Sequence, residues 1–478
     1  MLIVAQTLPD GKGLTNGGQS HLRRQELRDK VNALISPIIA DVFHEDMDDQ
    51  VTTLLGRRKG QHRKNVTPQP TVLRCAKCGR HTTIDFVRKG HYGRTQLTLW
   101  GSLDLTVPRI ECTCGHCPAI AFDIVSAYNR LWSDVDAVTM GLVAWSVSLR
   151  TIGAVVQLQS GQVISIGTTQ RRVKRVAALA AVEMRKNVTT SPPVVVLDAL
   201  WGSMMVETGE TKTDKRGRKR RVKRGKKIPL LVALGVDPVT GETTLLAWRE
   251  GTSEGVDDWT SLLTILYERG IAADSGLRLF IHDGCAGLES ALAMVDFGAV
   301  RRQRCIFHKL RNVTRDVLGH EGMTREEKRL RVLAVLTEAS AIYDAPDAAA
   351  ARERAAAFRL HWQEQEPKAV ATLERDFDMT LTYYALLEEA QAIGDVWRPQ
   401  CLRTTSLLEG ENGCLRAKWR QARSFWSAEG QTGALWLVAR QRERDDKKDR
   451  IAWLSAIVTG LLAARQTQPN FPTPGYSA

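Results

Sequence analysis

Two aspartates occupy positions at which buried strands would deliver a carboxylate to one edge of a sheet. Asp198 lies inside the apolar run VVVLDALW, and Asp283 stands at the end of the apolar run from Leu277 to Ile281, after His282. A buried carboxylate is costly unless something neutralises it, and a metal ion removes that cost. Open α/β sheets also hold their ligands at the carboxyl ends of the strands. The two aspartates are therefore candidate metal ligands, although helix capping is an alternative role for Asp283.

Five of the nine cysteines form a second candidate metal site in another part of the chain. They are Cys75, Cys78, Cys112, Cys114 and Cys117, and they bracket the segment TQLTLWGSLDLTVPRI. The alternation of apolar and polar residues in that segment predicts a β-hairpin. Two short cysteine turns that flank a hairpin are typical of a zinc ribbon, because tetrahedral zinc takes four thiolates from two such turns. Buried cysteines without a metal are the other interpretation.

The first cysteine turn of this predicted zinc ribbon is formed by Cys75 and Cys78. For the second turn, Cys114 and Cys117 have the usual spacing and are preferred. The predicted ligands of the structural zinc ion are thus Cys75, Cys78, Cys114 and Cys117. Cys112 with Cys114 would make a tighter turn and remains the alternative.

Residues 149–176 carry a pattern that indicates a helix-turn-helix. An apolar helix face is marked by Leu149, Ile152, Val155 and Val156; a turn follows around Gly161, and a basic helix begins at about Ser165. A short helix, a glycine-containing turn and a basic second helix describe this motif, whose second helix reads a major groove. The candidate DNA contacts are Thr169, Arg171, Arg172 and Lys174. An ordinary helical hairpin with solvated arginines is the alternative.

From residue 194 the pattern changes to alternating strands and helices. The predicted order is strand, strand, strand, helix, strand, helix, strand, which is the ribonuclease-H-like order. In such a sheet the first and fourth strands are adjacent, so Asp198 and Asp283 can reach one cation. The segment Lys215–Lys227 has ten Lys or Arg in thirteen positions. Interpreted as a loop near the catalytic edge, it offers phosphate contacts from Arg218, Lys219 and Arg220.

Composition limits the class of protein. The chain has 478 residues, 43% of them hydrophobic, and a net charge of +14. This composition excludes global disorder, predicts about three domains and suits a polyanionic partner. The longest late apolar run, Ile451–Ala464, is too short to span a bilayer, and no export signal is evident at the N-terminus. We expect a cytoplasmic protein without disulfides.

The expected fold class is multi-domain α/β plus α, with a ribonuclease-H-like mixed-sheet core. The expected parts are a helical region (1–65), a zinc-ribbon-like β domain (66–125), a helix-turn-helix region (126–190), the first part of the catalytic core (191–312), an all-α insertion (313–400), the completion of the core with C-terminal helices (401–465) and a tail (466–478).

Several collinear segments resemble the Mutator-type transposases of bacterial insertion sequences. They are RKGHYGRTQLTLWGSLDLTVPR, LDALW, EGVDDW before YERG, DGCAGLESAL, QRCIFHKLRNV, FRLHWQEQEP and RTTSLLEGEN. The chain departs from the family pattern at His91, which precedes Tyr92, and at Ser406, where the family usually has Asn. The cysteine-rich ribbon is not general to the family. The resemblance covers roughly residues 85–425.

The resemblance implies a DDE transposase with the acids Asp198, Asp283 and Glu409. Their carboxylates would bind two Mg²⁺ (or Mn²⁺) ions, which suit hard oxygen ligands and in-line displacement at phosphate. Water would cut the strand, and the resulting 3′-hydroxyl would attack target DNA. The implied partners are terminal inverted repeats, target DNA and further copies of the chain, in a homodimer or higher oligomer on DNA, with no membrane. The implied location is the bacterial nucleoid.

The third acid lies in the segment TTSLLEGENGCLRAKW, which contains two glutamates. On a helix, Glu409 shares one flank with Asn412 and Arg416, and Glu411 lies on the opposite flank. The wheel does not choose between them; the family register favours Glu409. Arg416, next to it, is a candidate DNA contact.

Cys305 and His308 form the Cys-x-x-His part of the segment QRCIFHKLRNV. As metal ligands they lack two further partners, so a structural or DNA-positioning role is preferred. Arg311 in the same segment is a candidate DNA contact. His282 is expected to point to the opposite face of its strand from Asp283 and to be uninvolved.

Two other functions remain open at this stage. A catalytically inactive or domesticated DNA-binding protein would retain the helix-turn-helix, although the presence of all three acids argues against it. A nuclease of the same fold would cut DNA without joining it.

Overall fold

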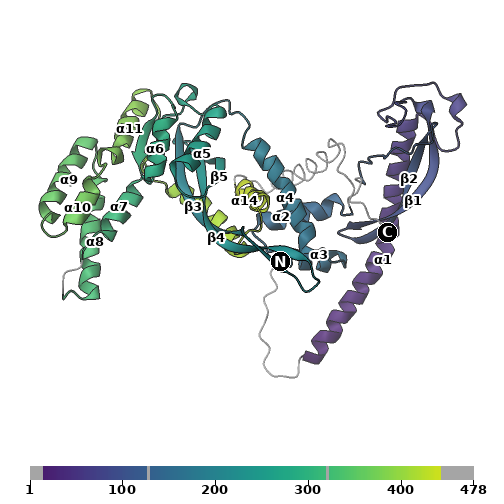
Figure 1. Cartoon of the computed structure of the whole chain (residues 1–478), viewed down its shortest axis with the longest axis horizontal. Helices are drawn as coiled ribbons and strands as arrows, with labels where there is room; N and C mark the ends of the chain where they lie inside the picture. The colour runs from purple at the N-terminus through teal and green to yellow at the C-terminus, as the bar shows by residue number, and fades with distance from the viewer. Residues whose placement is uncertain (1–13, 126–129, 319–321, 443–478) are drawn as a thin grey trace. The chain divides into compact units, whose positions relative to one another are not determined.

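The structure is a computed structural model that describes residues 14–125, 130–318 and 322–442 (Figure 1). The predicted tail and the apolar run Ile451–Ala464 lie outside these residues. The chain divides into two compact units, with the boundary between Arg172 and Val173. We call them the N-terminal unit and the C-terminal unit. None of the described helices combines the length and the hydropathy that crossing a membrane requires.

The first part of the N-terminal unit is a long helix packed on a hairpin. It contains α1 (Leu14–Leu55), β1 (Phe86–Thr98) and β2 (Gly101–Cys112), and β1 pairs with β2 in antiparallel fashion. The alternation in β2 places Leu103, Leu105 and Val107 in a core with Phe43 and Met47 of α1. The predicted hairpin is therefore confirmed, and α1 covers its apolar face.

Three helices follow: α2 (Ser133–Ala144), α3 (Leu149–Ser160) and α4 (Ile166–Glu183). Ser148 caps the start of α3 by accepting the amide of Thr151 (3.1 Å). Gly161 ends α3 in the left-handed conformation, at φ +72°, which glycine adopts without strain. The helices expected around this glycine turn are confirmed.

The C-terminal unit is built on a mixed five-stranded sheet in the order β5-β4-β3-β6-β7. Its strands are β3 (Val194–Thr213), β4 (Lys219–Val236), β5 (Thr243–Glu250), β6 (Leu279–His282) and β7 (Arg301–Arg304). The first three are antiparallel neighbours, whereas β6 runs parallel to β3 and β7 parallel to β6. The expected adjacency of the first and fourth strands is confirmed.

Two helices, α5 (Val256–Glu268) and α6 (Ala286–Met294), cover one face of this sheet. Trp259 and Leu263 of α5 and Leu288 of α6 pack in one core with Val195 and Leu197 of β3. Because side chains alternate between the faces of a strand, Asp198 must point to the opposite face.

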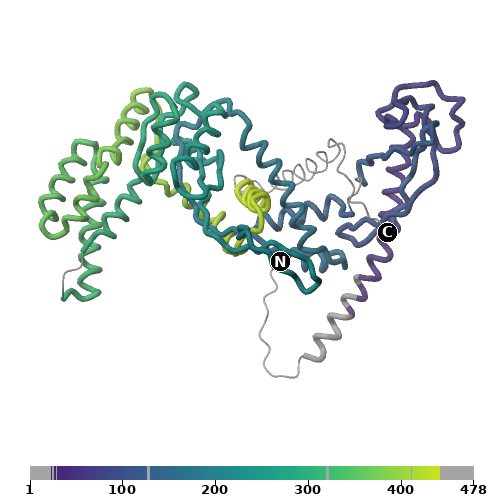
Figure 2. The backbone as a smooth tube through the Cα atoms, in the orientation of Figure 1, coloured from purple at the N-terminus to yellow at the C-terminus, as the bar shows by residue number. Residues whose placement is uncertain are grey.

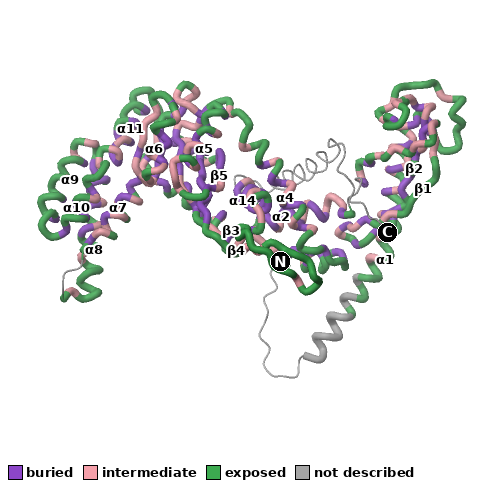
Figure 3. Tube along the Cα trace, in the orientation of Figure 1, coloured by how far each residue is buried: buried purple, intermediate pink, exposed green. Residues whose placement is uncertain are grey.

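The basic segment Lys215–Lys227 is not a loop, as the sequence suggested. From Lys219 on it belongs to β4, which pairs with β3 as far as Thr213↔Lys219. Figure 3 shows that the far end of this ribbon is exposed. Nothing in the sequence of this segment indicated a strand. Both faces of β4 are exposed to solvent here, so the segment lacks the apolar–polar alternation that a half-buried strand shows.

The remaining described helices follow β7. They are α7 (Ile306–Arg315), α8 (Arg325–Ile342), α9 (Ala348–Trp362), α10 (Pro367–Glu374), α11 (Thr382–Ala392), α12 (Gln400–Arg403), α13 (Ser406–Ala422) and α14 (Ala428–Arg442). Figure 2 shows α7 to α10 as a helical group that leads away from the sheet. Within the described residues, the segment expected to be helical throughout is therefore helical.

Candidate active site

The two aspartates lie at the same level of the sheet, Asp198 within β3 and Asp283 directly after the neighbouring parallel strand β6. The register of β3 and β6 pairs Val194 with Leu279 and Val196 with Ile281, and the same offset places Asp198 opposite Asp283. Since both follow the period-two alternation, both point to the face of the sheet opposite α5 and α6. The sheet thus brings together two carboxylates that are 85 positions apart in the chain.

Asp198 is held by two hydrogen bonds. Its Oδ1 accepts the amide of Ala199 (2.8 Å), and its Oδ2 accepts the side-chain amide of Asn412 in α13 (3.3 Å). Burial raises the pKa of Asp198 to about 6, although His308 and Arg416 nearby act in the opposite direction. A carboxylate with a raised pKa beside a second carboxylate is typical of a functional site.

Asp283 accepts the backbone amide of Cys285 (2.9 Å) through Oδ1. This bond forms a turn between β6 and α6 in which the aspartate accepts the amide two residues further on. It is not the helix cap considered as the alternative, because the N-cap residue of α6 is Cys285. This turn leaves the second carboxylate oxygen of Asp283 available to a metal ion.

Helix α13 is aligned over β3 by contacts at both of its ends. At its start, the amide of Thr405 donates to Cys305 Sγ (3.3 Å), and its hydroxyl lies 3.4 Å from His308 Nδ1. Toward its end, Trp419 Nε1 donates to the carbonyl of Ser203 (2.7 Å). The ring of Trp419 occupies the space above Gly202, where an added Cβ would lie 1.9 Å from it. Only glycine at position 202 permits this approach.

This alignment brings Asn412, and not Glu409, into contact with Asp198. Asn412 is fully buried, whereas Glu409, one turn earlier, is exposed. Among the described residues, the only group of three or more His, Cys, Asp or Glu ligands within 4.8 Å of one another consists of cysteines, so the three acids do not converge to that distance. The side chain of Glu411 lies outside those that the structure describes. The role of Asn412 was not recognised in the sequence.

Cys305 and His308 join β7 and α7 to this site. Cys305 is fully buried, and its amide donates to the carbonyl of His282 (2.7 Å). The hydrogen bond with Cys305 raises the pKa of His308 to about 8, and Asp198 and Asp283 add to the effect. His308 therefore faces the two acids as a cation near neutral pH.

His282 points to the opposite side of β6 from Asp283, as expected. Its Nε2 lies 3.4 Å from Glu289 Oε1 on α6, and its Nδ1 accepts the amide of Gly284 (3.1 Å). Burial lowers the pKa of His282 to about 4, so this ring is neutral at neutral pH.

Comparison with known proteins identifies the chain. Residues 68–447 match the family described as "Transposase, Mutator family". The chain belongs to the Mutator family of transposases. It is 24% identical over 401 residues to the transposase for insertion sequence element ISRM5 of Rhizobium meliloti (strain 1021), covering 84% of each chain. It is 27% identical over 339 residues to the transposase for IS406 of Burkholderia multivorans (strain ATCC 17616 / 249), covering 70% of this chain and 76% of that one.

A solved structure, titled Drosophila P element transposase strand transfer complex, is 11% identical with a TM-score of 0.37. The alignment covers 66% of this chain and 93% of that one.

Two of the four residues expected to contact DNA from α4 are buried in this transposase. Arg172 forms a short ion pair with Asp136 of α2, and only 8% of Arg172 is exposed. Thr169 is fully buried. These two assignments are therefore wrong, because the helix wheel alone did not show which side of α4 packs against the protein. Arg171 is exposed, and Lys174 is half-buried, 3.5 Å from Glu429.

Replacement of Arg171 by alanine should affect DNA binding, whereas replacement of Arg172 by alanine should affect the stability of the fold. Arg171→Ala should weaken binding to terminal-repeat DNA by about 1–3 kcal/mol at unchanged stability, because Arg171 is exposed and is a predicted DNA contact. Arg172→Ala should lower the free energy of unfolding by about 3 kcal/mol or more, because the buried ion pair with Asp136 is broken. Chemical denaturation and fluorescence anisotropy measure the two quantities. If both variants lost DNA binding equally and neither lost stability, Arg172 would have to break its ion pair with Asp136 in order to contact DNA.

On the β3–β4 ribbon, part of the positive charge is already paired. Arg220 contacts Asp214 (2.8 Å), Arg221 contacts Glu207 (2.8 Å), and Arg224 lies 3.5 Å from Glu210. Arg218 and Lys219 are exposed at the end of the ribbon. Arg311 and Arg416 are also exposed. Of the three predicted phosphate contacts on the ribbon, Arg220 forms a side-chain ion pair with Asp214 of the ribbon itself.

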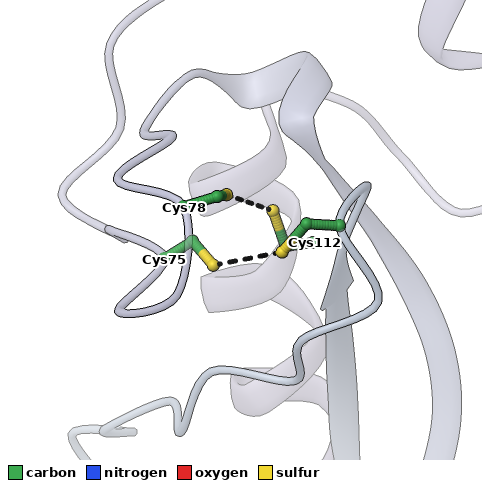
Figure 4. Close-up of side chains that lie close together, drawn as sticks. Cys75, Cys78 and Cys112 are labelled. Atoms are coloured by element: carbon green, nitrogen blue, oxygen red, sulfur yellow. Dashed lines mark hydrogen bonds between the residues drawn. The ribbon is translucent and has the colours of Figure 1, made fainter.

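The cysteine group differs from the preferred prediction in one ligand. The thiols of Cys75, Cys78, Cys112 and Cys114 all lie within 4.8 Å of one another. Figure 4 shows Cys75, Cys78 and Cys112 turned toward a common centre. Cys117 is exposed and does not belong to this group. The fourth thiol of the group is that of Cys112 instead of Cys117. The reason is that β2 ends at Cys112, so its thiol lies next to the first cysteine turn.

Proposed function

We propose that this transposase cuts the ends of an insertion sequence and joins them to target DNA by a DDE mechanism. The observation that carries the proposal is the register of β3 and β6, whose offset puts Asp198 beside Asp283 on the face of the sheet opposite α5 and α6. The strand order of the sheet is the order expected for a ribonuclease-H-like core, which we propose as the fold of this part.

The donor set suits Mg²⁺ or Mn²⁺, since carboxylate and amide oxygens are hard ligands. Burial opposes ionisation of Asp198, and a cation would offset that cost. Asn412 Oδ1 supports the same conclusion: it is buried and has no hydrogen-bond partner among the described residues. Asp198, Asp283 and Glu409 would hold the metal. When bound, the two ions supply activation of water and later of the 3′-hydroxyl, together with charge neutralisation at the phosphate.

The protein's own groups have distinct roles in this proposal. Asn412 holds Asp198 by its side-chain amide and is a positioning residue. Exposed Arg416 lies near Asp198 and would contact a phosphate of the bound strand. Glu409 lies three positions before Asn412 on α13, hence on the same side of the helix, and this supports it over Glu411 as the third acid.

DNA recognition is proposed for two other segments. Helices α3 and α4 would bind the terminal repeats through the exposed start of α4, with Arg171 as the leading contact. The exposed end of the β3–β4 ribbon, with Arg218 and Lys219, would bind phosphates without reading sequence. A homodimer or higher oligomer on the DNA would hold two ends for joining.

A strand-transfer assay tests the proposed function. The full chain is incubated with Mg²⁺ and DNA that carries the inverted repeats flanking its gene. We expect strand cuts at the repeat ends that leave 3′-hydroxyls, followed by joined products. Binding without cutting would identify a non-catalytic DNA-binding protein. Cutting without joining would identify a nuclease of the same fold.

A further inference from the structure

We infer that Cys75, Cys78, Cys112 and Cys114 bind one structural Zn²⁺ ion that organises the N-terminal unit. The inference is independent of the proposed chemistry at Asp198, because the cysteines belong to the other unit. It rests on the arrangement of the thiols, on the turns that carry them and on the core around them.

The distances between the thiols suit tetrahedral zinc. The sulfur atoms of Cys75 and Cys114 are 3.6 Å apart, and those of Cys78 and Cys112 are 3.5 Å apart. Four sulfurs at the usual Zn–S distance form a tetrahedron whose edge is about 3.8 Å. All four thiols lie within 4.8 Å of one another, so one central ion can reach each of them. Four soft thiolates select zinc over hard cations such as Mg²⁺.

The backbone forms a matching turn at each pair of thiols. In the first turn, Gly79 follows Cys78, has φ +74° and donates its amide to the carbonyl of Cys75 (2.8 Å). In the second turn, Gly115 follows Cys114, has φ +84° and donates its amide to the carbonyl of Cys112 (2.8 Å). Each left-handed glycine reverses the chain so that both thiols of a pair face inward. Cys117 lies beyond this second turn.

The position of the group indicates what the ion does. Cys75 precedes β1 and Cys112 ends β2, so the ion would tie the chain entering the hairpin to the chain leaving it. Both cysteines are buried in the core that contains Phe43 and Met47 of α1 and Phe86 of β1. This core is small, and small domains commonly need a metal or a covalent link for stability. The ion would therefore stabilise the packing of α1 on the hairpin.

Metal analysis of the full chain, purified under reducing conditions without added metal, provides the first test. We expect about one zinc per chain. After replacement of zinc by Co²⁺, the protein should show thiolate-to-cobalt charge transfer and the visible bands of a tetrahedral site. A zinc-free protein with four free thiols, or one with two disulfides in this group, would overturn the inference.

Two serine variants then identify the ligands. Cys112→Ser should lose most of the zinc and lower Tm, whereas Cys117→Ser, the matched control, should keep both at the wild-type level. If Cys112→Ser does not fold, Co²⁺ titration of the wild type and of Cys117→Ser still tests the ligand set, because identical cobalt spectra are expected. Loss of zinc in Cys117→Ser, or full zinc in Cys112→Ser, would contradict it.

Discussion

Replacement of Asp283 by asparagine is expected to reduce Mg²⁺-dependent cleavage of terminal-repeat DNA by a factor of about 10³ or more. The same loss is expected for Asp198→Asn. Asparagine retains the size and the acceptor oxygen of aspartate, so the hydrogen bond from the Cys285 amide can persist. It lacks the negative charge that binds the metal. Cleavage and joining should therefore disappear together, while affinity for the DNA ends stays near the wild-type value.

Asp296→Asn provides a matched control for these variants. Asp296 also accepts a backbone amide, from Gly298 (2.8 Å), but it is exposed beyond the end of α6. We expect this variant to cleave and join at the wild-type rate. A second readout is direct binding of Mn²⁺, measured by electron paramagnetic resonance, which should weaken in Asp198→Asn and Asp283→Asn. Wild-type cleavage by either variant would refute a metal site at β3 and β6.

Glu409→Gln is expected to abolish Mg²⁺-dependent cleavage and joining and to leave end binding intact, with a loss of similar size. Glu411→Gln should retain most of the activity. The reason is the orientation of α13: Asn412 contacts Asp198, and Glu409 shares its flank of the helix. Both variants remove one charge from the same turn of α13, so each controls for the effect of the other on helix stability.

The assay for this pair is cleavage of terminal-repeat DNA, with end binding measured in parallel. Active Glu409→Gln beside inactive Glu411→Gln would place the third ligand on the opposite flank of α13. Since Glu409 is exposed in the protein without DNA, its contact with metal is expected to form when the DNA ends bind. Glu409→Gln should therefore bind Mn²⁺ more weakly than wild type when DNA is present. Without DNA, the two proteins should differ less in Mn²⁺ affinity.

The sequence by itself determined the features that depend on neighbours along the chain. Gly161 ends α3 because only a residue that tolerates positive φ fits there, and the period-two pattern of β2 specifies one buried face. The order of elements from residue 194 also fixed which strands carry Asp198 and Asp283. The family motifs supplied what the periodicity could not, namely the preference for Glu409 over Glu411.

Only the tertiary structure decided which side chains face one another across the chain. It showed that Cys112, and not Cys117, completes the group of four thiols, because the end of β2 places the Cys112 thiol beside the first cysteine turn. It removed Arg172 from the exposed side of α4, because its ion-pair partner Asp136 comes from another helix. It placed Asn412 on Asp198, because α13 packs closely over β3 where Gly202 leaves room for the ring of Trp419. Each of these contacts joins residues distant in sequence, and a pattern that repeats along the chain carries no information about such partners.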